Sequence, residues 1–147
     1  MQSKQIIPIF AGEFPKQIIP LINSAKKSLH IIVFDWRWYP SDPGCSCQLF
    51  NQSIVNASRR GVSVSCLVND DSLLSLFSTF KIKCRKLISR HLLHTKLMII
   101  DEKHLIIGSH NYTQNAFTSN FESSVALLDC DDLSDYLKYF NSLFSSR

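Results

Sequence analysis

The sequence predicts an α/β domain in which a mixed β-sheet is flanked by helices on both faces. Short apolar, β-branched runs alternate along the chain with segments of helical periodicity, and no repeat or low-complexity linker interrupts them. Of the 147 residues, 45% are apolar and only 19% are charged, which excludes disorder because such a chain can bury a core. This length fits one ordinary domain. We therefore expect residues 1–147 to form a single unit.

Strands and helices alternate in the first half of the chain. The continuous apolar run Leu29–Phe34 is typical of a strand that is covered on both faces. Apolar residues at helical spacing predict a helix over 14–25, which Pro20 should kink or delay. Asp42-Pro43 is a helix-start pattern, and Gly61 marks the end of the helix that follows. The remaining elements expected here are strands over 6–10 and 62–68, and a short helix opened by Asp70 or Asp71.

The second half is expected to contain a hairpin over 94–101 and 104–111, a strand over 122–128 and a final amphipathic helix over 133–144. The commonest hairpin loop has two residues, here Glu102-Lys103. That register pairs His94 with Asn111 and Lys96 with Ser109, all on one face of the sheet. A three-residue loop would instead bring His110 to this face in place of Asn111.

This set of side chains suits a phosphate ligand. A lysine ammonium, a serine hydroxyl and an asparagine amide can together hold the non-bridging oxygens, and a histidine beside phosphorus can act as nucleophile or proton carrier. The sequence shows no carboxylate pair or Cys/His cluster that would hold Mg²⁺ or Zn²⁺ here. It therefore predicts phosphoryl chemistry without a metal or other cofactor.

Composition also bears on location and partners. The formal charge is +4, and no apolar run approaches the ~20 residues that a membrane span requires. Five cysteines without an export signal predict free thiols in a reducing compartment. We therefore expect a soluble, cytoplasmic protein with no stable membrane insertion.

The segment from His94 to Asn111 resembles the HxKx4Dx6GSxN signature of the phospholipase D superfamily, with every fixed position and both gaps matched. The resemblance implies a phospholipase D-like fold and a phosphohistidine intermediate. Two copies of the motif are needed for each active site, and this chain has one, so the resemblance implies a homodimer with a shared site. Its length is closest to the small bacterial Nuc-type endonucleases.

Roles for single residues follow from the resemblance and from the pattern around it. The resemblance implies catalytic roles for His94, Lys96, Ser109 and Asn111. Glu122 falls where single-motif members carry an acidic residue that orients the histidine. Asp101 belongs to the signature, but its place at the turn favours a structural role. His110 should point to the opposite face and serve packing or solvation.

Substrate-binding residues are expected in two other segments. The run from Lys81 to Lys96 has six basic residues and no acidic one, and we assign Lys83, Arg85, Lys86 and Arg90 in it to substrate. A solvated face is the alternative for that run. Trp36 and Arg37 follow a predicted strand and can border the site, where the indole could stack on an unpaired base or simply pack in the core or a dimer.

Together these observations predict a metal-independent phosphodiesterase, and the basic run favours DNA or RNA as its substrate. The first alternative is a phospholipid phosphodiesterase of the phospholipase D type. The second is a non-catalytic dimeric module that binds nucleic acid. The intact signature favours the enzyme over the binding module.

Overall fold

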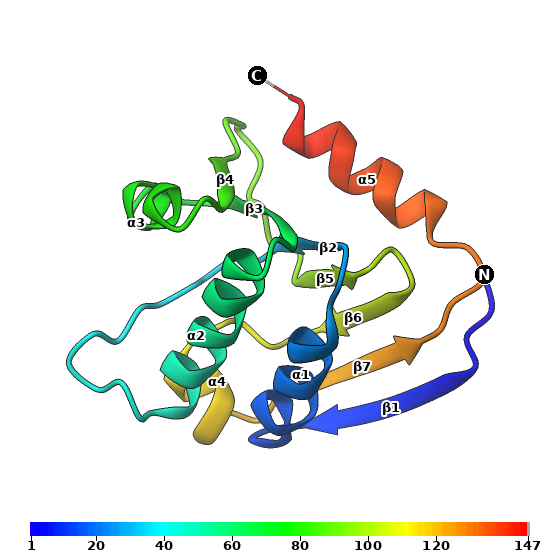
Figure 1. Ribbon diagram of the computed structural model, residues 1–147, viewed down its shortest axis with the longest axis horizontal. Helices are drawn as coiled ribbons and strands as arrows, with labels where there is room; N and C mark the ends of the chain where they lie inside the picture. The colour runs from blue at the N-terminus through cyan, green and yellow to red at the C-terminus, as the bar shows by residue number, and fades with distance from the viewer. Residues whose placement is uncertain (147) are drawn as a thin grey trace.

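The computed structural model describes residues 1–146 of the chain, and they form one sheet of seven strands with helices packed on it. The order of the strands is β1-β7-β6-β5-β2-β3-β4 (Figure 1). In chain order the elements are β1 (Gln5–Phe10), α1 (Glu13–Ser24), β2 (Ser28–Ile32), α2 (Ser46–Arg59), β3 (Ser63–Val68), α3 (Leu74–Thr79), β4 (Lys83–Lys86), β5 (Leu97–Ile100), β6 (His104–Gly108), α4 (Gln114–Thr118), β7 (Ser123–Leu128) and α5 (Ser134–Phe144).

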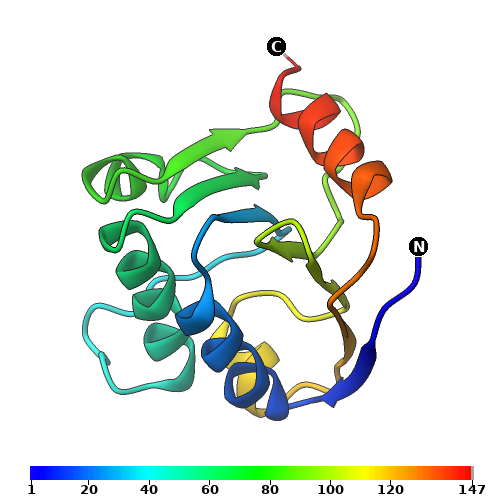
Figure 2. The ribbon, with the colours of Figure 1, turned by 45° about the vertical axis from the view of Figure 1, so that its right-hand side comes forward.

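The predicted fold class is confirmed. β2, β3 and β4 run parallel to one another, and the other neighbouring pairs are antiparallel, so the sheet is mixed. Residues of α1 to α4 share one buried core with one face of the sheet, whereas α5 packs on the other face. Figure 2 shows the strands between α1 and α2 on one side and α5, in orange and red, on the other.

The apolar run in β2 explains this two-sided packing. Leu29 and Ile31 face the core that contains α1 and α2, and Ile32 belongs to the smaller core under α5. His30 also faces α5, where its ring contacts Phe140 edge-on with 4.9 Å between ring centroids. A strand buried on both faces needs apolar residues at nearly every position, which is the pattern that predicted it.

Two elements differ from the sequence prediction. β4 (Lys83–Lys86) is a short, largely exposed edge strand, and its polar composition hid it from a search for apolar runs. α2 begins at Ser46 rather than at Asp42-Pro43, because the residues between form turns, with the Asp42 carbonyl accepting from the Cys45 amide at 3.2 Å.

The predicted register of the β5–β6 hairpin is wrong. Ile100 pairs with His104 and Leu97 with Ile107, so the loop has three residues, Asp101 to Lys103. The φ angles of Asp101 and Glu102 are +54° and +58°, a left-handed conformation that aspartate tolerates better than most residues. His94 therefore does not pair with Asn111, and Lys96 does not pair with Ser109.

Contacts of Asp101 explain the longer loop. Its carboxylate accepts hydrogen bonds from the backbone amides of Lys26, Lys27 and Ser28 at 2.7–3.1 Å. Burial alone would raise the pKa of this carboxyl, but these backbone bonds outweigh it and hold the pKa below 3.8. The carboxylate therefore ties the hairpin turn to the loop between α1 and β2, which keeps Asp101 out of the ladder.

Candidate active site

The candidate catalytic residues gather at one edge of the sheet, where four neighbouring strands begin or end. β2 and β6 run opposite to β5 and β7, so the ends of the first pair meet the starts of the second. His94 and Lys96 precede β5, Ser109 and Asn111 follow β6, and Glu122 precedes β7. The difference between the predicted and the observed register therefore does not separate the site residues, because all five lie just beyond the paired segments.

His94 and Lys96 form the exposed centre of this edge. The Lys96 Nζ lies 3.3 Å from Nδ1 and 3.2 Å from Nε2 of the exposed His94 ring. The Phe34 ring backs both, with its centroid 5.1 Å from that of His94 and 5.6 Å from the Lys96 Nζ. Burial lowers the pKa of Lys96, and the charge of Glu122 opposes that shift. The ammonium and the imidazole can thus contact the same phosphoryl group.

Glu122 is held by two side chains on its own side of the site. Ser109 Oγ donates to Glu122 Oε1 at 2.6 Å, and Asn120 Nδ2 donates to Glu122 Oε2 at 3.2 Å. Ser109 Oγ also accepts from the Ser123 amide at 3.0 Å, which fixes the hydroxyl in place. Within residues 1–146, Glu122 does not form the hydrogen bond to the His94 ring that would orient this ring. Asn120, which the sequence analysis missed, stands two residues before Glu122.

Asn111 is oriented by the backbone that follows β2. Its Oδ1 accepts from the Asp35 amide at 3.1 Å, so the NH₂ group is the end left to bind a ligand. Two further bonds join the same segments: the Arg37 amide donates to the Tyr112 carbonyl at 2.9 Å, and the Tyr112 amide to the Asp35 carbonyl at 3.0 Å. The chain after β2 is thereby held against the chain after β6.

His110, between Ser109 and Asn111, is part of the core rather than of the site. It is 1% exposed and stacks on Phe14 with 4.5 Å between ring centroids. Its Nε2 donates to the Ala11 carbonyl at 2.8 Å, which leaves Nδ1 to accept from Ser124 Oγ at 2.7 Å. Burial lowers its pKa, although the bond to Ala11 opposes the shift. The alternation of side chains thus separates a buried histidine from two exposed polar neighbours.

The assignment of Trp36 to substrate is wrong. The side chain is 4% exposed, its Nε1 donates to Asn51 Oδ1 at 2.8 Å, and its ring packs against Phe77 and Tyr112. An indole buried in this way has no free face on which a base could stack. Arg37 is exposed at the rim of the site, where its Nε bonds Asp35 Oδ1 at 2.8 Å.

The basic residues assigned to substrate, Lys83 to Arg90, lie in and after β4, away from the catalytic residues in the order of the strands. β4 is the edge strand, separated from β5 by β3 and β2. Arg85 donates to the Phe144 carbonyl at 3.0 Å and its guanidinium lies 4.7 Å from the centre of the Phe144 ring, so it secures the end of α5. Lys83, Lys86 and Arg90 are exposed. Arg85 is thus accounted for without substrate, whereas the other three remain available to a polyanion.

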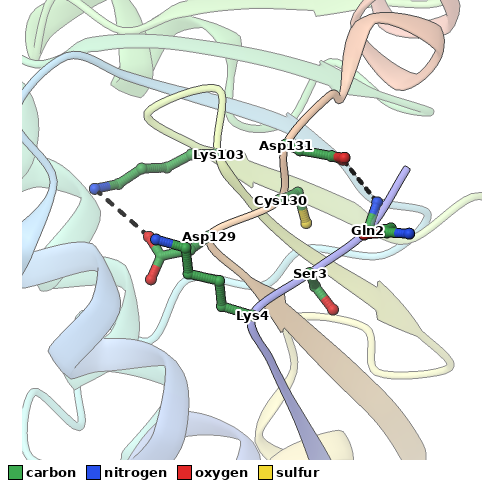
Figure 3. A pocket seen from close by; sticks show the side chains of 7 residues that line it. All are labelled: Gln2, Ser3, Lys4, Lys103, Asp129, Cys130 and Asp131. Atoms are coloured by element: carbon green, nitrogen blue, oxygen red, sulfur yellow. Dashed lines mark hydrogen bonds and ion pairs between the residues drawn. The ribbon is translucent and has the colours of Figure 1, made fainter.

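A separate pocket of about 440 Å³ lies at the opposite edge of the sheet, near the start of β1 and the end of β7 (Figure 3). Its charges are balanced: Lys103 lies 3.9 Å from Asp129, and the Gln2 amide donates to Asp131 at 2.6 Å. The β5–β6 turn contributes Lys103 to it. It therefore does not extend the catalytic edge.

Three features of residues 1–146 bear on metal binding, membrane insertion and disulfides. No group of three or more His, Cys, Asp or Glu side chains is placed to hold a metal ion. None of the described helices is both long and apolar enough to cross a membrane. All five cysteines are free thiols, and Cys47, Cys66 and Cys130 among them are buried.

Comparisons with known proteins place the chain in a family. The family model "Cardiolipin synthase, PLD-like domain" matches residues 18–144. A phospholipase D of Rickettsia felis is 32% identical over 129 residues, which is 84% of this chain and 60% of the relative. The 5'-3' exonuclease PLD3 of Xenopus tropicalis is 26% identical over 134 residues, or 80% of this chain and 27% of the relative. The chain thus spans about three fifths, or less, of the length of these relatives.

Solved structures share the fold over the whole chain. Nuc from Salmonella typhimurium, a phospholipase D family member, superposes with a TM-score of 0.79 at 21% identity, over 95% of this chain and 93% of its own. NucT from Helicobacter pylori gives a TM-score of 0.77 at 17% identity, over 97% and 98%. The family model covers most of the sequence. The fold agrees with it, and so does the HxK motif, His94-Thr95-Lys96, before β5. The chain belongs to the phospholipase D superfamily.

Proposed function

We propose that this protein is a metal-independent nuclease that cleaves DNA or RNA through a phosphohistidine intermediate, at a site shared by two copies of the chain. The observation that carries the proposal is the placement of His94, Lys96 and Asn111 at one sheet edge, with Ser109 and Glu122 beside them. These residues supply a nucleophile and phosphate donors without a metal.

Each step has a group to perform it. Lys96 and the Asn111 amide bind the non-bridging oxygens, and a ring nitrogen of His94 attacks phosphorus while the bond to the leaving oxygen breaks. The leaving oxygen takes a proton from a second histidine. Water then gives a proton to that histidine and attacks phosphorus, and the P–N bond to His94 breaks. Ser109 already donates to Glu122, so we assign it to holding the carboxylate rather than the phosphate.

The second histidine must face the first across phosphorus, because in-line displacement puts the attacking and leaving groups on opposite sides. Three other histidines are held elsewhere: His30 against Phe140, His104 as acceptor of the Asp129 amide, and His110 in the core. His91 is exposed but has no lysine two residues later. A symmetry-related His94 from a second copy fits the requirement.

Exposed apolar side chains beside the site support an interface with that second copy. Phe121, next to Glu122, is fully exposed, and Leu92, two residues before His94, is 67% exposed. Single exposed apolar side chains are normal on a protein surface, so the support comes from the place of these two, which flank the edge that a partner has to cover.

Nucleic acid is favoured over lipid by two observations. Nuc and NucT match this chain over nearly their whole length, and TrmBL2, an archaeal chromatin protein with a novel mode of DNA binding, matches 95% of this chain with a TM-score of 0.63. Lys83 and Lys86 in the edge strand β4, and Arg90 after it, are exposed. A phospholipid substrate remains the second candidate, because several relatives at 27–32% identity are named phospholipase D.

The direct test offers plasmid DNA, single-stranded DNA, RNA and phospholipid vesicles to the protein in millimolar EDTA. We expect cleavage of nucleic acid to persist. Loss of cleavage in EDTA with rescue by Mg²⁺ would overturn the mechanism. Release of a lipid headgroup without cleavage of nucleic acid would establish the phospholipase alternative, and binding without any turnover would establish the binding module.

The shared site has its own test in mixed dimers of wild-type and His94→Ala chains, purified with two different affinity tags. Each composite site then lacks one histidine, so we expect activity close to zero. Half of the wild-type activity would mean that each subunit works alone. Wild-type dimers carrying the same two tags are the control.

A further inference from the structure

A polar cavity of about 580 Å³ adjoins the catalytic edge and has no role in the reaction described above. It lies between the segment 35–39, which follows β2, and the segment 111–120, which includes α4. The volume is in the range of ~300–1,000 Å³ that is usual for small-molecule sites. Its walls are unusual in carrying four side-chain amides, from Asn111, Gln114, Asn115 and Asn120.

Two residues join this cavity to the site. Asn111 belongs to the signature and also lines the cavity, and Asn120 lines it while donating to Glu122 at 3.2 Å. A group that occupies the cavity is therefore next to the phosphoryl group that Lys96 and Asn111 hold. In a polynucleotide, that neighbour is a nucleotide on one side of the scissile phosphate.

Two of the four amides, those of Gln114 and Asn111, are held so that their donors remain available. Gln114 Oε1 accepts from the Cys47 amide at 2.9 Å, and Asn111 Oδ1 accepts from the Asp35 amide at 3.1 Å. With each oxygen bonded to the backbone, the NH₂ groups are the polar ends left for a ligand. The cavity is thus set to recognise acceptor atoms.

Charge in the cavity disfavours a second phosphate. Arg37 and Asp35 are the charged residues that line it, and the Arg37 Nε bonds Asp35 Oδ1 at 2.8 Å. The pair has no net charge, so an anion gains little Coulomb attraction here. An acyl chain fits no better, because it would leave the amides without partners.

A nucleobase matches all of these features. Base edges carry the carbonyl oxygens and ring nitrogens that amide side chains recognise, and base faces stack on aromatic rings. Trp38 and Tyr39 supply aromatic surface to the cavity, and the Tyr39 hydroxyl accepts from the backbone N–H of Gln114 at 2.8 Å, which fixes the two walls together.

We propose that this cavity is a base-binding subsite for the nucleotide next to the scissile phosphate. Bases in a duplex have their pairing edges occupied, so such a subsite selects single-stranded or locally opened nucleic acid. The inference rests on the proposed nuclease function and adds a substrate class to it.

The first test changes only the substrate. It uses a DNA strand in which methylphosphonate linkages leave a single cleavable phosphodiester, with an abasic residue placed on one side of that bond or on the other. We expect one of the two positions to lower kcat/KM by roughly 5- to 150-fold, the range that stacking of one base contributes. Equal rates for the intact strand and for both abasic strands would overturn the inference.

The second test changes the subsite. Gln114→Glu keeps an oxygen to accept from the Cys47 amide but replaces the free NH₂ donor by an acceptor. We expect the ratio of kcat/KM for the strand to that for bis(p-nitrophenyl) phosphate, which has no base, to fall at least about tenfold. Gln52→Glu makes the same charge change on an exposed part of α2 and should leave the ratio unchanged.

The outcomes separate this inference from the nuclease proposal. If the wild-type protein cleaves bis(p-nitrophenyl) phosphate but no strand, the nuclease proposal fails and the subsite fails with it. If it cleaves strands and neither the abasic residue nor Gln114→Glu changes the ratio, the nuclease proposal stands and the subsite alone is overturned.

Discussion

The two ends of the β5–β6 hairpin carry polar residues of the same signature, but the hydrogen bonds of these residues differ between the two ends. At the turn, the Asp101 carboxylate is bonded to three backbone amides of the loop before β2. At the open end, His94 is exposed and its ring nitrogens have the Lys96 ammonium as neighbour. One end uses its polar atoms for the fold, and the other leaves them for a ligand.

This difference in hydrogen bonding separates structural residues from candidate catalytic residues within one motif. A polar group whose hydrogen bonds all go to the backbone contributes to stability, because its removal leaves the backbone amides unpaired. A polar group held at an edge with few protein partners contributes little to stability and is free to bind substrate. Substitutions at the two ends should therefore act on different measurements.

The largest expected effect is the loss of turnover in His94→Ala. Acid–base assistance alone contributes ~10²–10⁴-fold, and removal of the nucleophile adds to that, so we expect no measurable cleavage. The melting temperature should stay close to that of the wild type because the ring is exposed. His91→Ala, in the same loop, is the matched control and should retain activity. A folded His94→Ala dimer with substantial activity would contradict the assignment of the open end.

Gly108→Ala should affect both measurements, because Gly108 lies where β6 ends and the site begins. A β-carbon there would overlap Oγ and Cα of Ser124 on the neighbouring strand. Ser124 Oγ also bonds His110, so the strands have to separate to make room. We expect a loss of about 1–3 kcal/mol in the free energy of unfolding and reduced activity from displacement of Ser109.

Chemical denaturation and the rate of cleavage would measure these two losses. Gly44→Ala is the control, because a β-carbon at that position meets no atom within 4 Å. Unchanged stability in Gly108→Ala would show that the contact between β6 and β7 is looser than the structure indicates.

Asp101→Ala should show the reverse of His94→Ala. Loss of the bonds to the backbone amides should lower the free energy of unfolding by about 1–2 kcal/mol, a range kept low because solvent screens the half-exposed turn. The folded protein should keep its activity at low temperature. Asp71→Ala removes an exposed carboxylate elsewhere and is the control. An activity loss in Asp101→Ala larger than its unfolded fraction would assign this carboxylate to the chemistry.

The smallest expected effect is the pH dependence of the stabilisation that the Asp101 carboxylate provides. The pKa of Asp101 lies below its ordinary value of 3.8, so the unfolded state binds more protons in the interval between the two values. The stabilisation is therefore complete above about pH 5 and is lost as pH falls through the folded-state pKa. The stability gap between wild type and Asp101→Asn should narrow as pH falls from 6 to 3, as measured by urea denaturation. A gap that stays constant would mean that the negative charge is not the source of the stabilisation.

Local patterns were enough to predict the fold class and the composition of the site. The apolar run of β2 and the helical spacing of α1 each indicate their element without reference to the rest of the chain. The spacing of the signature places His94 and Lys96 before one strand and Ser109 and Asn111 after the next. Because the two strands are joined by a short turn, neighbours in sequence are bound to be neighbours at the sheet edge.

Local sequence patterns could not predict the exposure or the contacts of the candidate substrate-binding residues. Trp36 and Arg37 are adjacent in sequence, yet one is 4% exposed and the other lies at the surface. Arg85 is exposed like its basic neighbours, yet its guanidinium is bonded to the Phe144 carbonyl of α5. In each case the deciding partner comes from a distant part of the chain, such as Phe144 for Arg85.

The sequence by itself thus determined which groups a hairpin brings to one place: an imidazole, an ammonium, a hydroxyl and an amide. Only the tertiary structure decided the register of that hairpin, because the amides that hold Asp101 lie 73–75 residues away in the sequence. It also decided the position of the amide-lined cavity. The walls of this cavity, at 35–39 and 111–120, are brought together because β2 and β6 belong to the same sheet. Hydrogen bonds between distant segments fix both features, and a local pattern of residue types carries no information about such bonds.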